Sequence, residues 1–458
     1  MVWIHGGGYI LGSGGSGKDL SIDGSALAVM HDVIVVTLNY RLGVLGFFNV
    51  PGTSTRGNYG MLDQIAALRW VKKNIAVFNG DPNKVTIFGE SAGAGSVSLL
   101  AISPLIKGEK LFIRAIQQSG TASCPWASYQ AKTNDVAKLF GASLGCKDMS
   151  TIVDCLRNKP VNDIMVKQTS MEAQVIKLLA PVVDNHFMTS LPWELEKANA
   201  IEAHNIEFMM GFNKDEGTMF ALPAGTKGVK KTDFKHVIKL NTALRYPGKE
   251  DLFQDATFHE YTQYGQTNAQ LKWADSSSEF LGEYMFKNNI VNTANSLARG
   301  GKTVYFYRLV FMPQHTNVPS WKVAHAIDLA FVFGTPFTGY RSFLQSNYTE
   351  EDRTVSRKVM AMWTDFAKNG NPGNSWPKYT HSGRQHMVIG SNLTTSNELA
   401  SRMLEFWNDL VPKLTNVSYS KACDNKNNNI GSSSVKTESA ASFLAFVLAF
   451  VMATFPFV

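Results

Sequence analysis

The stretch Phe88-Gly89-Glu90-Ser91-Ala92-Gly93-Ala94 decides the fold. It contains the pattern G-x-S-x-G, with a largely apolar segment, 84–88, before it and the small residues 92–96 after it. The first segment is typical of a buried strand, and the small residues suit the start of a closely packed helix. A serine on such a sharp turn has its hydroxyl lifted clear of its neighbours. The pattern therefore predicts that Ser91 is a nucleophile.

A second motif near the start of the chain supports this interpretation. The glycine run His5-Gly6-Gly7-Gly8 follows the apolar residues 1–4. In α/β-hydrolases such a run supplies backbone amides to the oxyanion hole. Together the two motifs predict a serine hydrolase with the α/β-hydrolase fold, in which helices flank a mostly parallel central sheet.

Composition bounds the class of protein. The chain has 458 residues, of which 44% are hydrophobic, and this is ample for a large core. The formal net charge is +7, but lysines and arginines are scattered. Mixed surface charge of this kind indicates a solvated basic surface, so we expect no nucleic-acid partner. The ten histidines show no metal-ligand spacing, so we expect neither a metal nor another cofactor.

Cysteines and glycosylation sequons favour a secretory route. Cys146 and Cys155 bracket a short segment and are placed to close a small disulfide loop. Three N-x-[ST] sequons begin at Asn347, Asn392 and Asn416. Such sequons are acceptors for N-glycans, and disulfides persist in oxidising compartments.

The N-terminus does not resemble that of a complete secreted chain. Residues 1–4 look like a central strand that leads directly into the glycine run, with no charged region or signal-peptide core before it. We therefore expect further strands and a signal peptide to precede Met1 in a longer chain, because the edge of the sheet needs cover.

The C-terminus predicts a lipid anchor. Residues 1–416 would form the catalytic domain, and 417–442 are a polar, low-complexity tail. Residues 443–458 are apolar throughout, but 16 residues are short for a spanning helix, which needs about 20. Small residues, a polar spacer and an apolar end match a GPI-anchor signal, with cleavage expected at Ser432 or Ser433.

A serine nucleophile needs a base, and the base needs an orienting acid, in the chain order Ser, Asp or Glu, His. Residues 206–212 read as a buried strand and are followed by a turn that contains Asp215 and Glu216. Either carboxylate fits the acid. A later strand over 303–309 precedes a loop with two histidines, of which His325 is the leading candidate for the base and His315 the competitor.

Longer matches identify the family that the chain resembles, which is the type-B carboxylesterase and cholinesterase family. The resemblance runs from Met1 to about Asn416. Its most specific stretches are Asn39-Tyr40-Arg41-Leu42-Gly43, Gly57-Asn58-Tyr59-Gly60-Met61-Leu62-Asp63-Gln64, Gly80-Asp81-Pro82, Gln118-Ser119-Gly120, Cys124-Pro125-Trp126-Ala127-Ser128, 213–217, Val332-Phe333-Gly334 and Phe406-Trp407.

The resemblance implies a role for each site residue. It selects Glu216 over Asp215 as the acid, with His325 as the base. Gly7, Gly8 and Ala92 would supply the oxyanion-hole amides. Ser119 would support the acid, and Glu90 would face a cationic group of the substrate. Trp126, Met219 and Phe220 would lie at the substrate pocket.

The resemblance also bears on the cysteines. Cys146 and Cys155 fall where the family closes a short disulfide loop, and Cys124 falls where some members keep a buried free thiol. Cys423 lies beyond the domain, where some cholinesterases join two subunits, so a disulfide-linked homodimer is one expectation. We also expect Trp70, Trp363 and Trp407 to belong to the core.

Two departures from the family pattern concern the site. Ala326 follows the histidine where the family often has glycine, and a methyl group is tolerable there unless the backbone needs a positive φ angle. Met219 stands where cholinesterases often have an aromatic residue, and 175–180 lacks the paired phenylalanines that narrow an acetyl pocket. These differences favour a roomier acyl pocket and a broad esterase.

Two functions remain open on the sequence alone. The first is a serine esterase, secreted or anchored outside the cell, with choline esters as one candidate substrate. The second is a non-catalytic adhesion protein of the neuroligin type, or an inactive fragment of an esterase. The intact set of Ser91, Glu216 and His325 favours the enzyme, because neuroligin-like proteins commonly lack the nucleophile.

Overall fold

The computed structural model describes residues 1–416, except for 16–21, 129–132, 172–178, 198–204, 222–228, 243–245, 247–248, 316–321, 339–346 and 374. The predicted tail 417–442, the apolar segment 443–458 and Cys423 lie outside the described residues, as does most of 175–180.

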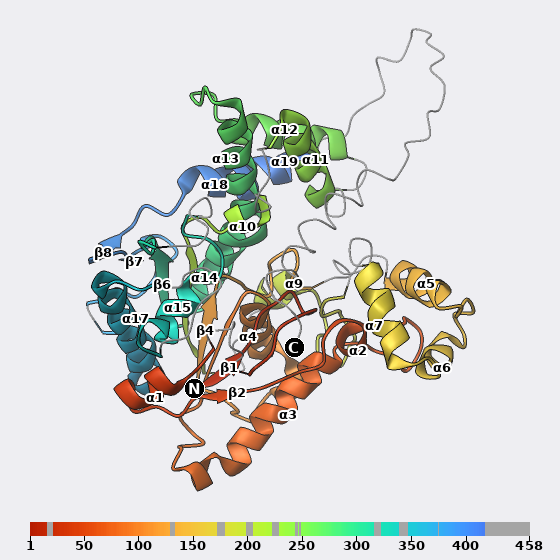
Figure 1. Ribbon diagram of the computed structural model, residues 1–458, viewed down its shortest axis with the longest axis horizontal. Coiled ribbons are helices and arrows are strands. Elements are labelled where there is room, and N and C mark those ends of the chain that lie inside the picture. The colour runs from red at the N-terminus through yellow and green to blue at the C-terminus, as the bar shows by residue number, and fades with distance from the viewer. Residues whose placement is uncertain are drawn as a thin grey trace.

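A single eight-stranded sheet organises the molecule (Figure 1). Its order is β2-β1-β3-β4-β5-β6-β7-β8, and neighbouring strands are parallel except for β7 and β8. The strands are β1 Val2–Ile4, β2 Val36–Thr37, β3 Thr86–Glu90, β4 Arg114–Gln118, β5 Glu207–Asn213, β6 Val304–Leu309, β7 His386–Ile389 and β8 Leu393–Ser396. This is the predicted α/β-hydrolase architecture, and it confirms the strands expected before Ser91, at 206–212 and at 303–309.

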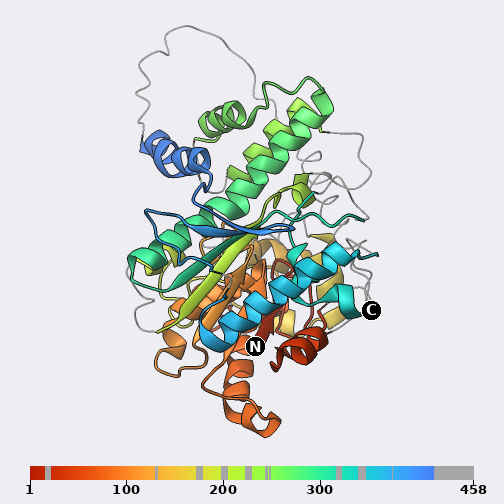
Figure 2. The ribbon, with the colours of Figure 1, turned by 90° about the vertical axis from the view of Figure 1, so that its left-hand side faces the viewer.

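Helices cover both faces of the sheet, and Figure 2 shows α17 lying across one of them. The α-helices are α1 Ser25–His31, α2 Gly43–Phe47, α3 Tyr59–Asn74, α4 Ala92–Ile102, α5 Thr133–Ser143, α6 Ile152–Arg157, α7 Val161–Ser170, α9 Pro192–Lys197, α10 Thr218–Ala221, α11 Lys231–Thr242, α12 Glu250–Tyr261, α13 Ala269–Gly282, α14 Asn288–Arg299, α15 Asp328–Val332, α16 Thr335–Thr338, α17 Glu350–Asn369, α18 Ser401–Glu405 and α19 Val411–Asn416. Shorter 3-10 turns are η1 Ile75–Phe78 and η2 Pro104–Ile106, and π-helical turns are η5 Glu283–Lys287 and η7 Phe406–Leu410. Within the described part of the chain, no helix is both long and apolar enough to cross a bilayer.

The strands bury side chains on both faces, so the sheet separates two hydrophobic cores. In β5, Phe208 and Met210 pack into the core that contains residues of α4 and α14, while Met209 packs into the core that contains residues of α17. Successive side chains of a strand point to opposite faces, and strands covered on both sides are apolar at every position. The apolar run 208–212 of β5 follows from this double burial, whereas β3 is buried at every position but also contains Thr86 and Glu90.

The expectation for the tryptophans is partly wrong. Trp363 and Trp407 are buried, at 1% and 6% exposure, but Trp70 is 50% exposed on α3. Trp70 packs beside Phe78 of η1, with ring centroids 6.1 Å apart. An aromatic side chain alone is therefore not enough to place a residue in the core.

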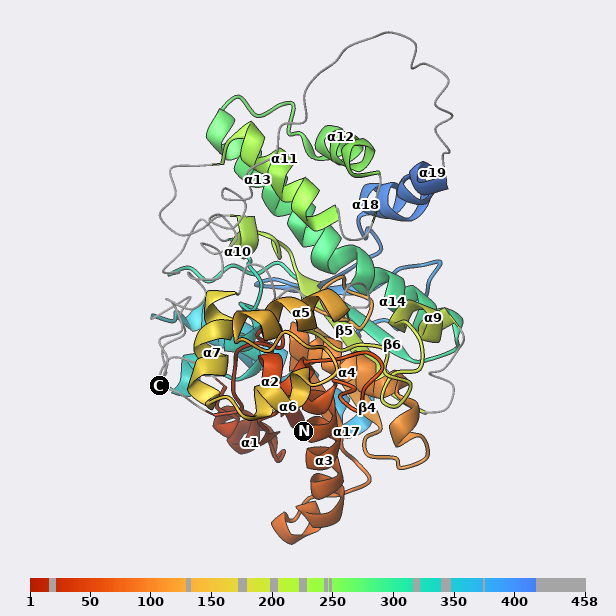
Figure 3. The same ribbon diagram turned by 90° about the vertical axis from the view of Figure 1, so that its right-hand side faces the viewer.

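Two groups of helices extend from the sheet. Figures 1 and 3 show α11, α12 and α13 together with the C-terminal α18 and α19 at one end of the molecule. The helices α5, α6 and α7 form a second group, which contains the predicted disulfide. Cys146 and Cys155 are joined, with their Cα atoms 5.7 Å apart, and this confirms the predicted pairing.

Removing this disulfide should lower the stability of the domain. Replacing both cysteines, Cys146→Ser with Cys155→Ser, frees the unfolded chain from a short closed loop and should lower the free energy of unfolding by about 2 kcal/mol. Urea unfolding, followed by circular dichroism, measures this loss. A reducing agent should destabilise the parent protein by a similar amount and leave the double variant unchanged; equal urea midpoints for both proteins would contradict the expectation.

Candidate active site

Ser91 occupies the sharp turn between β3 and α4. Its backbone has φ 56° and ψ −123°, a strained conformation for a residue with a side chain, and its amide donates to the carbonyl of Gln118 at 2.9 Å. Gly6 packs directly against this turn, since a Cβ there would meet the carbonyl oxygen of Glu90 at 2.7 Å and Ser91 Cβ at 3.1 Å. The sequence Gly-x-Ser-x-Gly and the glycine run thus form one closely packed unit.

The glycine run leaves backbone amides beside the Ser91 turn. Gly7 and Gly8 have φ angles of 100° and 62°, which favour glycine. Among the described residues, the amides of Gly7, Gly8 and Ala92 have no hydrogen-bond acceptor. Ala92 is the first residue of α4, and amides in the first turn of a helix have no acceptor within the helix. These N–H groups are free to bind an anionic oxygen.

Glu216 is completely buried and its carboxylate is fully engaged. Its Oε1 accepts hydrogen bonds from Ser119 Oγ at 2.6 Å and from the amide of Asn213 at 2.7 Å. Its Oε2 lies 2.6 Å from Nδ1 of His325. A carboxylate buried at 0% exposure requires such partners, because its desolvation is otherwise costly. The structure therefore brings Glu216, Ser119 and His325 together.

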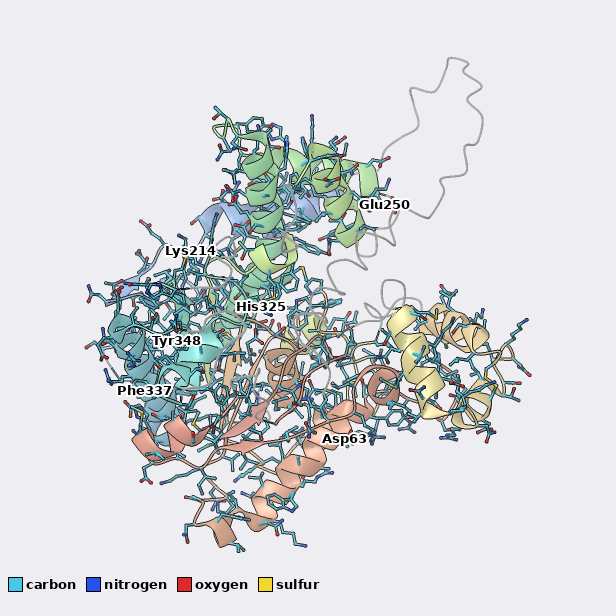
Figure 4. The ribbon with its side chains drawn as sticks, in the orientation of Figure 1. Asp63, Lys214, Glu250, His325, Phe337 and Tyr348 are labelled. Carbon is cyan, nitrogen blue, oxygen red and sulfur yellow. A yellow bond between two sulfur atoms is a disulfide. The ribbon has the colours of Figure 1, made fainter. Side chains whose placement is uncertain are left out.

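The alternatives to Glu216 and His325 lie elsewhere. Asp215 braces the histidine loop: its amide donates to the carbonyl of Val323 at 2.9 Å, and its Oδ2 accepts from the amide of Val323 at 3.2 Å. His315 is exposed on the loop after β6. Geometry thus places Glu216, and not Asp215, against the buried imidazole of His325, which lies in the interior of the molecule in Figure 4.

The other nitrogen of His325 faces Glu90. Its Nε2 lies 3.1 Å from Glu90 Oε1, and no hydrogen bond joins it to Ser91. Burial alone would lower the pKa of His325, but the carboxylates of Glu90 and Glu216 outweigh burial and raise it to about 9. Burial raises the pKa of Glu90 to about 8, although His325 partly offsets the effect. The imidazole thus lies between the carboxyl groups of Glu90 and Glu216, and both groups favour its protonated form.

A third buried carboxylate, that of Asp328, lies three residues after His325. Asp328 accepts hydrogen bonds from Gln118 Nε2 at 2.7 Å and from Asn213 Nδ2 at 3.1 Å. Gln118 in turn accepts from the indole N–H of Trp363 at 3.0 Å. Burial raises the pKa of Asp328, and the two amide donors partly offset this rise. The chain of contacts ties β4, β5 and α17 to the residues that follow His325.

Aromatic rings form one wall beside the imidazole. The rings of Phe220 and Phe286 have centroids 5.5 and 4.5 Å from that of His325, and 5.4 Å from each other. Trp126 continues the wall, with its centroid 5.6 Å from that of Phe286. Met219 packs instead against the core on the α17 side of the sheet. Of the three predicted pocket residues, Trp126 and Phe220 thus share this wall.

Phe286 and Met285 were not predicted, although both are part of the wall. Met285 contributes its carbonyl oxygen, which accepts from Trp126 Nε1 at 3.0 Å. Both residues lie in the π-helical turn Glu283–Lys287, within a run of helix that carries no local motif. π-Helical turns often occur at functional sites, but their hydrogen-bond pattern is visible only in a structure.

The remaining predicted residues have these positions. Asn347 and Asn392 are exposed, and Asn416 is the last residue of α19. Cys124 is a buried free thiol, and burial raises its pKa to about 12. Within the described ranges, no cluster of three or more His, Cys, Asp or Glu residues is arranged to hold a metal ion.

Ala326 has a φ angle of 66°, so the backbone does adopt the conformation in which glycine is preferred. Ala326→Gly should therefore raise the free energy of unfolding by about 0.5–1 kcal/mol, because the relief of strain exceeds the extra entropy of glycine in the unfolded chain. Urea unfolding measures the change. The matched control is Ala324→Gly in the same loop, where φ is not positive. This change should lower the free energy of unfolding by about 1 kcal/mol. If both variants are less stable than the parent, the backbone at Ala326 is not strained.

Comparison with known proteins agrees with this geometry. The Carboxylesterase family matches residues 1–407. A medium-chain fatty acyl-CoA hydrolase precursor of Anas platyrhynchos is 36% identical over 432 residues, covering 90% of this chain and 73% of the relative. Neuroligin-3 of Mus musculus is 34% identical, in a match that covers 91% of this chain and 52% of the neuroligin. Acetylcholinesterase of Bungarus fasciatus is 32% identical, in a match that covers 91% of this chain and 70% of the acetylcholinesterase. The chain spans about half the length of the neuroligin. With its mostly parallel sheet and this degree of similarity, the chain belongs to the carboxylesterase family.

Proposed function

We propose that this protein hydrolyses carboxylic esters through an acyl-enzyme on Ser91. The observation that carries the proposal is the buried contact of 2.6 Å between Glu216 and His325 Nδ1, together with the contact of His325 Nε2 with Glu90, the residue that directly precedes Ser91 on its strained turn. An acid that orients an imidazole beside an exposed hydroxyl is the arrangement that activates serine for acyl transfer.

In the proposed reaction, Ser91 Oγ attacks the ester carbonyl carbon while His325 Nε2 accepts the hydroxyl proton. The carbonyl oxygen becomes negatively charged and binds the amides of Gly7, Gly8 and Ala92. Collapse of this intermediate breaks the bond to the leaving alcohol, which takes the proton from His325. Water then attacks the acyl-enzyme by the same path in reverse and releases the carboxylic acid and free Ser91.

The contact between His325 and Glu90 defines the resting state of this cycle. The imidazole must lose its proton and turn Nε2 from Glu90 toward Ser91 before it can act as a base. Catalytic hydrogen bonds often become short only when substrate is bound, so the resting contact with Glu90 is compatible with the role. A substrate that fills the site would displace His325 from Glu90 by occupying the space beside the carboxylate.

The walls of the site favour esters with uncharged groups. Phe220, Phe286 and Trp126 present apolar surface beside the imidazole. Glu90 is the carboxylate expected to attract a cationic alcohol, but it is already engaged with His325. We therefore infer a general carboxylesterase in preference to a cholinesterase. The names of two relatives, a fatty acyl-CoA hydrolase and an acetylcholinesterase, both describe transfer of an acyl group to water, from a thioester in the first case and from an oxygen ester in the second.

We also infer that the protein works outside the cell. The Cys146–Cys155 disulfide and the exposed sequon residues Asn347 and Asn392 suit an oxidising, glycosylating route. Attachment to the membrane through a lipid anchor on the C-terminal tail, and a homodimer linked through Cys423, remain proposals that rest on the sequence.

Substitution of the nucleophile tests the proposed function. Ser91→Ala should reduce turnover of a naphthyl ester by at least about a thousandfold, because no other group forms the acyl-enzyme. It should also abolish covalent labelling by a fluorophosphonate probe. The matched control is Ser54→Ala, which changes an exposed serine outside the turn between β3 and α4.

The outcomes separate the two candidate functions. Comparison of naphthyl ester with acetylthiocholine distinguishes a general esterase from a cholinesterase. A folded protein that neither turns over ester nor reacts with the probe would overturn the proposal. That result would favour a non-catalytic, neuroligin-like role, since neuroligin-3 matches the chain over a similar length.

Glu90→Gln should shift the pH profile of hydrolysis. The acid limb of kcat/KM reports the loss of a proton from His325, whose pKa is raised to about 9 partly by the charge of Glu90. Removing that charge makes the protonated imidazole less stable and lowers the pKa of His325. The acid limb should therefore move to lower pH by about one unit. The control is Glu398→Gln, which changes an exposed carboxylate. A limb that stays in place or moves to higher pH would show that Glu90 does not hold the proton on His325.

A further inference from the structure

The π-helical turn Glu283–Lys287 connects α13 to α14 and interrupts an otherwise regular run of helix. A π-helical turn contains one residue more than an α-helical turn, and this displaces the side chains that follow. Asn289 stabilises the turn locally, because its Nδ2 donates to the carbonyl of Tyr284 at 2.8 Å. Such turns are rare enough to need an explanation, and the two sides of this one supply it.

One side of the turn faces the proposed active site. Phe286 is 1% exposed and packs against His325, and the carbonyl of Met285 holds the indole of Trp126. The position of the turn therefore sets how far the ring of Phe286 projects beside the imidazole. A shift of the turn would move Phe286 and release Trp126 together.

The other side of the turn is held by a buried hydrogen-bond chain. Trp407 Nε1 donates to Tyr261 Oη at 2.7 Å, and Tyr261 Oη donates to Glu283 Oε2 at 2.6 Å. All three residues are buried, with exposures of 6%, 1% and 7%. Trp407 lies in the C-terminal turn η7 and Tyr261 ends α12, so the chain joins three separate elements.

This chain is the main restraint on Glu283 in the protein interior. Burial raises the pKa of Glu283, although Lys287 and the bond from Tyr261 partly offset the effect. Arg402 lies over the ring of Tyr261 at 5.4 Å and pairs with Glu260 and Glu279, not with Glu283. Loss of the tyrosine hydroxyl would leave the buried Glu283 oxygen without its donor, and such an oxygen is stabilised by moving toward solvent.

We infer that Tyr261 is a positioning residue that controls acyl-chain selectivity, because its hydroxyl fixes the π-helical turn that presents Phe286 to His325. Tyr261 touches neither substrate nor His325 and acts through Glu283 and Phe286. The selectivity part of this inference rests on the proposed ester hydrolysis, whereas the effect on the turn does not.

The test uses the full chain and four variants. Tyr261→Phe removes one buried hydroxyl, and Phe286→Ala removes the ring on which Tyr261 would act; the third variant combines both. The fourth, Tyr379→Phe, is the matched control. Tyr379 is 3% exposed and donates to Asn295 Oδ1 at 2.9 Å, so it also bonds to this helical run, but after the π-helical turn.

The first measurement is the ratio of kcat/KM for p-nitrophenyl octanoate to that for p-nitrophenyl acetate. Phe286→Ala should raise the ratio by roughly tenfold, since it opens space beside the acyl group. Tyr261→Phe should raise the ratio by about fivefold, the equivalent of one lost hydrogen bond. In a protein that already carries Phe286→Ala, the Tyr261→Phe change should not alter the ratio further. The inference would be overturned if the double variant changed the ratio by the product of the two single effects. It would also be overturned if Tyr379→Phe changed the ratio as much as Tyr261→Phe does.

The second measurement is amide hydrogen exchange over residues 283–289, which needs no activity. Tyr261→Phe should accelerate exchange there by about fivefold, and Tyr379→Phe should not. Unchanged exchange in Tyr261→Phe would overturn the inference even if the protein is an esterase. If no Ser91-dependent turnover exists, the proposed function fails and exchange alone decides the role of Tyr261. Should Tyr261→Phe not fold, Trp407→Phe removes the indole donor of the same chain and replaces it in both measurements.

Discussion

The carboxylate of Glu216 lies where water does not reach, and the arrangement of the site follows from satisfying it. Burial of a carboxylate costs several kcal/mol unless hydrogen bonds replace its hydration. Its three partners come from different places: Ser119 follows β4, the amide belongs to Asn213 at the end of β5, and His325 lies on the loop after β6. Because these strands are parallel neighbours, their carboxyl ends meet at one edge of the sheet.

The register of the strands aligns the residues that contact Glu216. Gln118 pairs with Gly211, and Gly211 pairs with Tyr307, so β4, β5 and β6 are aligned directly beneath the site. A Cβ at position 211 would meet the ring of Tyr307 at 2.4 Å, and the glycine therefore allows that ring to lie flat on the strand. A shift by one residue would turn the buried side chains of these strands to the opposite core. The two hydrophobic cores thus hold the register on which the contacts of Glu216 depend.

Local patterns in the sequence were sufficient for the parts of the site that lie at strand ends. The G-x-S-x-G turn and the order of acid and histidine pointed to Ser91 and His325 and left Asp215 and Glu216 open as the acid; the family resemblance then selected Glu216 and Gly7, and the structure places Glu216 against His325. Phe286 and Trp407 were not recognised as site residues, because their contacts join helices distant in sequence. Trp70 was misplaced because an apolar ring fits a helix surface as readily as a core.

The bond between Trp407 and Tyr261 joins residues that are 146 positions apart, and it has a consequence for biosynthesis. A ribosome releases the chain from its N-terminus, so strands β1 to β6 and the residues Ser91, Glu216 and His325 emerge well before η7 does. Until the last helical turns dock, the back of the site lacks its anchor and Glu283 has an incomplete hydrogen-bond chain. The nascent protein would therefore pass through a stage with Ser91, Glu216 and His325 in place but with an unfinished aromatic wall beside the imidazole.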